Sequence, residues 1–78
     1  MSREKFKKLL KDAYLEIRFD YNGKTTFVSP LGSGKYDFMY GEDVEHNDIA
    51  FDELITTPFF NGKTILDIVD DITELEEI

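Results

Sequence analysis

Apolar residues near the start of the chain recur at the i, i+3, i+4 and i+7 spacing of one helix face, at Phe6, Leu9, Leu10 and Ala13. This spacing predicts an amphipathic helix from about Arg3 to Ala13. Ser2 precedes it and belongs to the residue types favoured as N-caps. The lysines of the segment fall opposite the apolar stripe, so we expect them to face solvent.

The next segment shows strict alternation, the period of a half-buried β-strand. Its apolar positions are Leu15, Ile17, Phe19 and Tyr21, and its polar positions are Glu16, Arg18 and Asp20. Asn22-Gly23 follows, and this dipeptide is typical of a hairpin turn. We therefore expect a second strand that runs through Phe27 and Val28.

Two registers are open for this hairpin. A two-residue type I′ turn would place Val28 opposite Ile17. A three-residue loop, with Gly23 in a left-handed bulge, would instead place Phe27 opposite Ile17. We prefer the three-residue loop, because it buries the larger apolar side chain and pairs opposite charges across the strands.

A third strand is predicted over Lys35–Tyr40, after a loop rich in glycine and serine. Its alternation sends the aromatic residues to one face and the remaining residues to the other, with Tyr36, Phe38 and Tyr40 opposed to Asp37 and Met39. The polar segment that follows is expected to be a turn. Whether residues 44–49 form a short fourth strand is left open.

Helical spacing returns in the last third of the chain. Phe51, Leu54 and Ile55 predict a helix, which Pro58 ends because it disfavours helical geometry at the residue before it. A turn follows at Asn61–Lys63, and Thr64 with Asp67 then matches a capping box at the start of a final helix. The apolar stripe of that helix comprises Ile65, Ile68, Val69, Ile72 and Leu75.

These elements predict one small α+β domain over residues 1–78. Its N-terminal helix precedes an antiparallel meander of three or four strands, and two C-terminal helices pack on one face of the meander. The apolar content of 41% is sufficient for a folded globule. The sequence has no cysteine, which excludes disulfides and thiol chemistry. It also has no long apolar stretch or signal-like segment, so we expect a cytoplasmic protein with no membrane partner.

The net charge of −8 is distributed very unevenly along the chain. Residues 1–11 carry five basic residues and one acidic residue, and residues 12–36 are balanced. Residues 37–78 carry thirteen acidic residues and one lysine, a net charge of −12. The chain therefore has a basic start and a strongly acidic C-terminal half.

Two glycine-lysine segments resemble phosphate-binding loops only superficially. Gly32-Ser33-Gly34-Lys35 leads into a strand, whereas such a loop should open a helix. Gly62-Lys63-Thr64 lacks the earlier glycine of the pattern, because Thr57 occupies that position. We interpret the first as a turn and the second as a turn that leads into a helix cap, and expect no nucleotide cofactor.

Catalytic and metal-binding patterns are weak in this sequence. Oxygen ligands for a divalent cation are densest at residues 42–48, which include the single histidine, His46, but the EF-hand order is absent. No set of residues indicates a nucleophile with its base, so we expect no enzymatic activity and no bound cofactor. The N-terminal lysines could contact nucleic acid, but the negative charge of the rest of the molecule opposes this.

The acidic C-terminal half is the most distinctive feature. We expect a non-enzymatic protein-interaction or regulatory module that presents an anionic surface to a basic protein. The candidate interaction residues are Asp67, Asp70, Asp71, Glu74, Phe59 and Phe60. The two phenylalanines are either both buried or partly exposed as an apolar anchor. The alternatives are a protein that binds a small ligand or divalent metal, and self-association through the basic helix and the acidic half.

Overall fold

The structure is a computed structural model that describes all 78 residues. Its strands are β1 (Ile17–Tyr21), β2 (Lys24–Pro30), β3 (Lys35–Tyr40), β4 (Val44–Ala50) and β5 (Thr73–Glu77). Its helices are α1 (Arg3–Asp12), α2 (Phe51–Thr56) and the 3₁₀ turn η1 (Val69–Asp71). The strands form one antiparallel sheet in the order β4-β3-β2-β1-β5. The α+β class is confirmed, and no helix has the length and apolar character needed to cross a bilayer.

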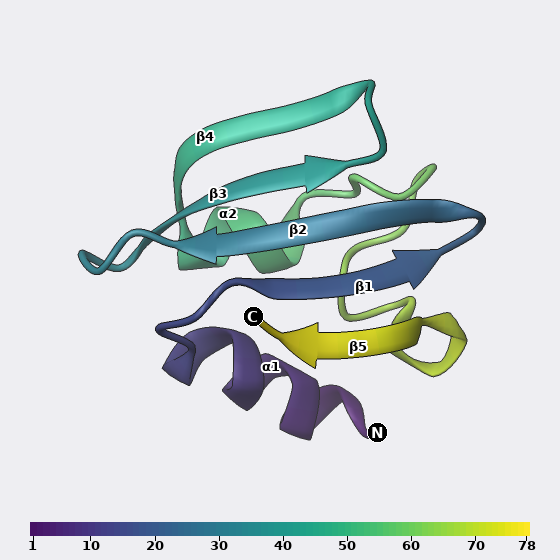
Figure 1. Ribbon diagram of the computed structural model, residues 1–78, viewed down its shortest axis with the longest axis horizontal. Helices are drawn as coiled ribbons and strands as arrows, with labels where there is room; N and C mark the ends of the chain where they lie inside the picture. The colour runs from purple at the N-terminus through teal and green to yellow at the C-terminus, as the bar shows by residue number, and fades with distance from the viewer.

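The sheet has one covered face and one open face. Strands β1 to β4 form a meander, after which the chain crosses the sheet and returns to place β5 beside β1. In Figure 1, α2 lies behind β2 and β3, on the covered face. The core lies between this face and the segments that cover it, and it contains sixteen buried apolar residues.

Helix α1 forms as its apolar spacing predicts. The Ser2 hydroxyl caps it by accepting the backbone N–H of Lys5 at 3.2 Å. Phe6 and Leu10 are fully buried, and the Phe6 ring packs edge-on against Phe19 of β1 with centroids 5.9 Å apart. These contacts fix α1 against the covered face of the sheet.

A tyrosine hydroxyl from the sheet also holds the end of α1. Tyr36 of β3 donates a hydrogen bond to the backbone carbonyl of Leu10 at 3.0 Å. This carbonyl belongs to the last turn of the helix, where backbone acceptors have no partner within the helix. Burial of the ring raises the pKa of Tyr36, and the nearby Asp12 carboxylate raises it further.

The β1–β2 hairpin has the two-residue turn, so the preferred three-residue loop is wrong. Asn22 (φ 52°) and Gly23 (φ 78°) both lie in the left-handed region, as a type I′ turn requires. Ile17 therefore pairs with Val28 and not with Phe27. The twist of a type I′ turn matches the right-handed twist of paired strands, and this outweighs the larger apolar area of phenylalanine.

Strand β3 has the predicted alternation, with its three tyrosine and phenylalanine rings buried. The fourth strand, left open from the sequence, forms over Val44–Ala50. The pairing of β3 with β4 is irregular between Tyr36 and Phe38. There Asp48 adopts φ 56°, and its backbone N–H donates to the carboxylate of Asp37 at 2.9 Å. The Asp37 carboxylate thus accepts the Asp48 N–H, which lies outside the regular hydrogen-bond ladder between β3 and β4.

The second Asn-Gly pair forms the same kind of turn as the first. Asn61 (φ 56°) and Gly62 (φ 89°) connect Phe60 to Lys63, which form an isolated antiparallel bridge. Phe59 and Phe60 are both buried. Phe60 lies at the centre of an aromatic cluster whose other rings belong to Phe19, Tyr21, Phe38 and Tyr40.

The predicted final helix is wrong. The capping-box contacts form, since the Thr64 N–H donates to the Asp67 carboxylate at 2.9 Å and the Asp67 N–H to the Thr64 hydroxyl at 3.3 Å. The chain nevertheless forms only the 3₁₀ turn η1 and then strand β5. The shorter helix predicted before Pro58 is present as α2. A helix here would gather acidic side chains at its negative C-terminal end. It would also leave the backbone groups on one side of β1 without the pairing that β5 provides.

Replacement of Phe60 by alanine should be far more destabilising than replacement of Met39. The buried Phe60 ring contacts four aromatic rings, so its loss should lower the free energy of unfolding by about 3–5 kcal/mol. Met39 is exposed on the open face, so M39A should cost less than about 1 kcal/mol. Urea unfolding measures both, with F60L as a milder variant if F60A does not fold. Equal losses for Phe60 and Met39 would contradict this core.

Candidate interaction surface

The residues predicted from the sequence to form an interaction surface are divided between the exterior and the core. Asp70, Asp71 and Glu74 are exposed around η1 and the start of β5. The rings of Phe59 and Phe60 lie in the core, where Phe59 stacks on Phe38 with centroids 4.4 Å apart. Acidic and apolar members of the predicted set are therefore not brought together on one exposed surface.

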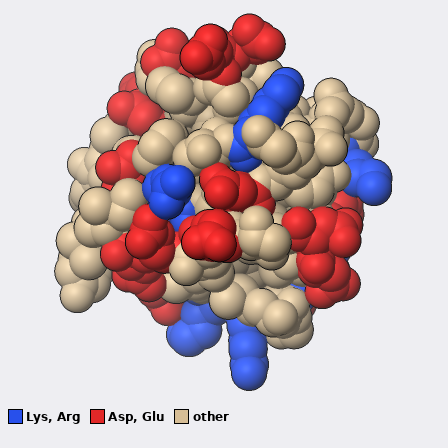
Figure 2. All heavy atoms as spheres, turned by 45° about the vertical axis from the view of Figure 1, so that its right-hand side comes forward, with Lys and Arg blue, Asp and Glu red and all other residues tan.

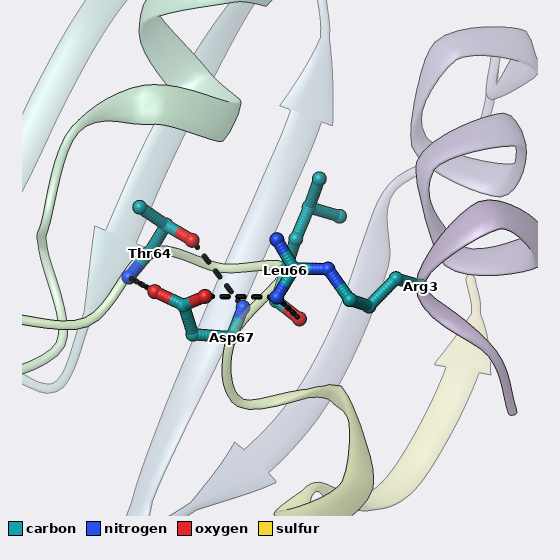
Figure 3. Close-up of polar contacts among 4 residues, drawn as sticks. All are labelled: Arg3, Thr64, Leu66 and Asp67. Atoms are coloured by element: carbon teal, nitrogen blue, oxygen red, sulfur yellow. Dashed lines mark hydrogen bonds and ion pairs between the residues drawn. The ribbon is translucent and has the colours of Figure 1, made fainter.

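Asp67 is engaged within the molecule (Figure 3). Arg3 at the start of α1 donates from Nη1 to the Asp67 carboxylate at 2.8 Å, and the same nitrogen lies 3.3 Å from the Leu66 carbonyl. The hydrogen bond from Arg3 is the main reason that the pKa of Asp67 falls to about 2, and the bonds from Thr64 lower it further. This pair joins the basic start of the chain to its acidic C-terminal half.

The open face of the sheet carries a row of side chains that crosses all five strands. Directly opposed residues of antiparallel strands lie on the same face. The register places these residues in one row in the order Glu76, Arg18, Phe27, Met39 and Glu45. Phe27 is only partly buried and Met39 is exposed, so an aromatic ring and a thioether form the apolar centre of the row.

Shallow hollows lie on two sides of this apolar pair, and both are lined by Phe27 and Met39. The first is also lined by Glu16, Asp37 and Glu45. The second is also lined by Lys24, whose Nζ lies 5.2 Å from the centroid of the Tyr40 ring, and by Glu42 and Asp43 in the turn between β3 and β4. We call Phe27, Met39 and the carboxylates of Glu16, Asp37 and Glu45 the open sheet face.

The carboxylates of the open sheet face have no basic partner. The four ion pairs of the molecule involve Arg3, Lys8 and Arg18, and none of them includes Glu16, Asp37 or Glu45. Figure 2 shows several groups of acidic side chains on the visible surface, with basic side chains between some of them and two side by side at the lower edge. The open sheet face thus combines apolar contact area with uncompensated negative charge.

Arg18 is the one basic residue in the row, and its charge is already matched. Its Nη1 donates to Glu76 at 2.7 Å, and its Nη2 lies 4.0 Å from Asp20. The hydrogen bond with Glu76 is the main reason that the pKa of Arg18 is raised, and the charges of Asp20, Glu76 and Glu74 add to it. Arg18 therefore does not neutralise the β3 and β4 side of the face.

The other segments considered from the sequence lie apart from this face or lack convergent side chains. Gly32, Ser33 and Gly34 lie in the loop between β2 and β3, Lys35 is the first residue of β3, and Gly62 belongs to the tight turn after Phe60. The acidic segment at residues 42–48 lies in the β3–β4 turn and in β4. No group of three or more histidine and acidic side chains lies close enough to hold a metal ion. The His46 ring packs on Phe59, with centroids 4.7 Å apart.

The sequence contained part of the signal for the open sheet face. The alternation in β3 already placed Asp37 and Met39 opposite the buried tyrosines. Phe27 was missed because the preferred hairpin register directed it into the core. A register shift of one residue turns every side chain of a strand to the other face. The φ values at Asn22 and Gly23 decide this point.

Comparison of the chain with protein-family models, with curated proteins and with solved structures finds no match in any of the three.

Asp67 should contribute to stability in a pH-dependent manner. Its pKa of about 2 in the folded protein lies below its ordinary value of 3.8, so its ionised form favours folding. This contribution is complete above about pH 4 and is lost as the pH falls towards 2. The difference in unfolding free energy between wild type and D67N should therefore be constant above pH 4 and shrink below it.

Urea unfolding at several pH values measures this difference. D70N is the matched control, because Asp70 is exposed and its carboxylate makes no side-chain hydrogen bond or ion pair. The same pH dependence in D70N would contradict a specific role for the contact between Arg3 and Asp67.

Proposed function

We propose that this protein is a non-enzymatic interaction module that binds a basic protein segment through its open sheet face. The observation that supports this most directly is the position of Phe27 and Met39, which are paired on the open face beside carboxylates without basic partners. Binding sites commonly have this arrangement, with an apolar centre and a polar rim. A basic segment with apolar side chains would match both parts.

The two parts of the face would have different roles in binding. The apolar pair would supply most of the affinity, because desolvated aromatic anchors dominate interface energetics. The rim carboxylates would favour cationic partners and raise the association rate, while each exposed ion pair adds only about 0.2–1 kcal/mol. Specificity for basic partners would thus come from Glu16, Asp37 and Glu45, and contact area from Phe27 and Met39.

The acidic groups near the C-terminus form a second anionic surface, which differs from the open sheet face in having no exposed apolar residues of the predicted set beside it. Asp70, Asp71 and Glu74 are exposed, but the apolar residues predicted to accompany them are buried. These carboxylates would attract a basic partner without offering it an apolar anchor. The open sheet face is therefore the better candidate for a site of contact.

Binding should be measured with a defined probe, a synthetic peptide in which lysine alternates with leucine. We expect its titration to shift the NMR signals of Phe27, Met39 and Glu45. F27A should weaken binding by about fivefold or more, which corresponds to about 1 kcal/mol for loss of an anchor. E45Q should weaken it by up to about fivefold. The same peptide with glutamate in place of lysine should not bind.

The matched control is D70N, which removes one negative charge outside the open sheet face, as E45Q does within it. Shifts confined to residues 70–74, or equal weakening by D70N and E45Q with no effect of F27A, would reject the open sheet face as the site. Circular dichroism should show that each variant is folded.

A further inference from the structure

The structure contains a second exposed surface whose charge and composition complement the open sheet face. Lys7 and Lys11 lie one helical turn apart on the exposed side of α1, and neither forms an ion pair. Tyr14 follows the helix directly and is 85% exposed, the most exposed of the large apolar side chains. We call Lys7, Lys11 and Tyr14 the basic helix surface.

The basic helix surface supplies the positive charge that the open sheet face lacks, together with an exposed aromatic ring. Its lysines could pair with the carboxylates of Glu16 and Glu45, and its aromatic ring could contact Phe27 and Met39. Tyrosine is favoured at interfaces because it supplies a large apolar area together with a polar group. Nothing within its own molecule covers most of the Tyr14 side chain.

One molecule cannot bring its own two surfaces together. Phe6 and Leu10 attach α1 to the covered face of the sheet, through contacts with residues such as Phe19. Phe27 and Met39 lie on the opposite face of the same sheet. A contact of the α1 lysines with Phe27, Met39 and Glu45 must therefore join two copies of the chain.

We infer that the open sheet face binds the basic helix surface of a second copy, so that the protein associates head to tail. This inference rests on the proposed function and names the partner as another molecule of the same chain. The contact is heterologous, since different surfaces meet. A row of copies joined in this way always has one open sheet face free at one end and one basic helix surface free at the other. Growth therefore does not stop at a dimer unless the rotation between successive copies closes the row into a ring.

Ionic strength should have opposing effects on this association. At about 0.01 M salt the Debye length is about 30 Å, as long as the molecule, whose extents are 30 × 26 × 23 Å. The net charge of −8 on each copy then opposes any approach. At about 0.15 M the Debye length is about 8 Å, which screens this repulsion but leaves ion pairs at contact distance largely intact. At about 1 M these pairs are screened as well.

Sedimentation velocity of the full chain should show this dependence. We expect the average mass at high protein concentration to exceed the monomer mass most clearly near 0.15 M salt, and to fall towards it at 0.01 M and 1 M. The matched variants are K7Q/K11Q, which removes the lysines, and F27A/E45Q, which alters the open sheet face. Each should remain monomeric alone, because each lacks one of the two surfaces.

Mixing the two variants provides the decisive measurement. Isotope-labelled K7Q/K11Q retains the open sheet face, and unlabelled F27A/E45Q retains the basic helix surface. Their mixture should shift the signals of Phe27, Met39 and Glu45 in the labelled protein, and its mass should not exceed that of a dimer. Near 0.15 M salt, where the change in net charge is screened, D70N/D71N should associate like wild type.

Three results would overturn the inference. They are a monomer at all three salt concentrations, undiminished association of either variant alone, and shifts in the mixture that map to residues 70–74. If the lysine-leucine peptide still binds at Phe27 while the protein remains monomeric, the proposed function stands and only self-association is rejected. If neither the peptide nor a second copy shifts Phe27, both fail.

Discussion

The register of the β1–β2 hairpin is the constraint on which the rest of the structure depends. The two left-handed residues of the turn set Ile17 opposite Val28, and the meander carries this choice from strand to strand. It directs Val28 and Phe38 to the core, where the covering segments pack on them. It equally directs Phe27 to the open face of the sheet beside Met39. Core and candidate surface are thus two consequences of one turn.

The covered face shows how a small chain without disulfides builds a core. Aromatic side chains from the sheet meet Phe59 and Phe60, which a tight turn presents side by side. Large rings bury much apolar area per residue, and edge-to-face contacts add to it. The segment after this turn also contributes buried residues, although it forms no regular helix. The packing of these rings therefore takes the place of the final helix expected from periodicity, whereas the shorter helix before Pro58 is present as α2.

The uneven charge along the sequence acquires a spatial meaning in the fold. Only Arg3 of the basic start pairs with the acidic C-terminal half, through Asp67. The remaining basic charge of α1 is exposed on the covered side of the sheet, and uncompensated carboxylates lie on its open side. The unpaired lysines of α1 and the uncompensated carboxylates of the open sheet face therefore lie on opposite sides of the sheet. A net charge alone would describe the molecule as uniformly acidic.

The sequence by itself determined the elements whose periodicity and turn chemistry agree. It determined α1 with its Ser2 cap, the alternation of β3 and the short helix that ends before Pro58, because local spacing and capping suffice for these. Only the tertiary structure decided the hairpin register and the presence of β4. It also decided the conformation of Thr73–Glu77, a segment that fits a helical stripe but forms strand β5 and pairs with β1. In each case the choice depended on a partner distant in the sequence. The open sheet face follows from such a choice, since side-chain direction changes with every one-residue shift of a strand.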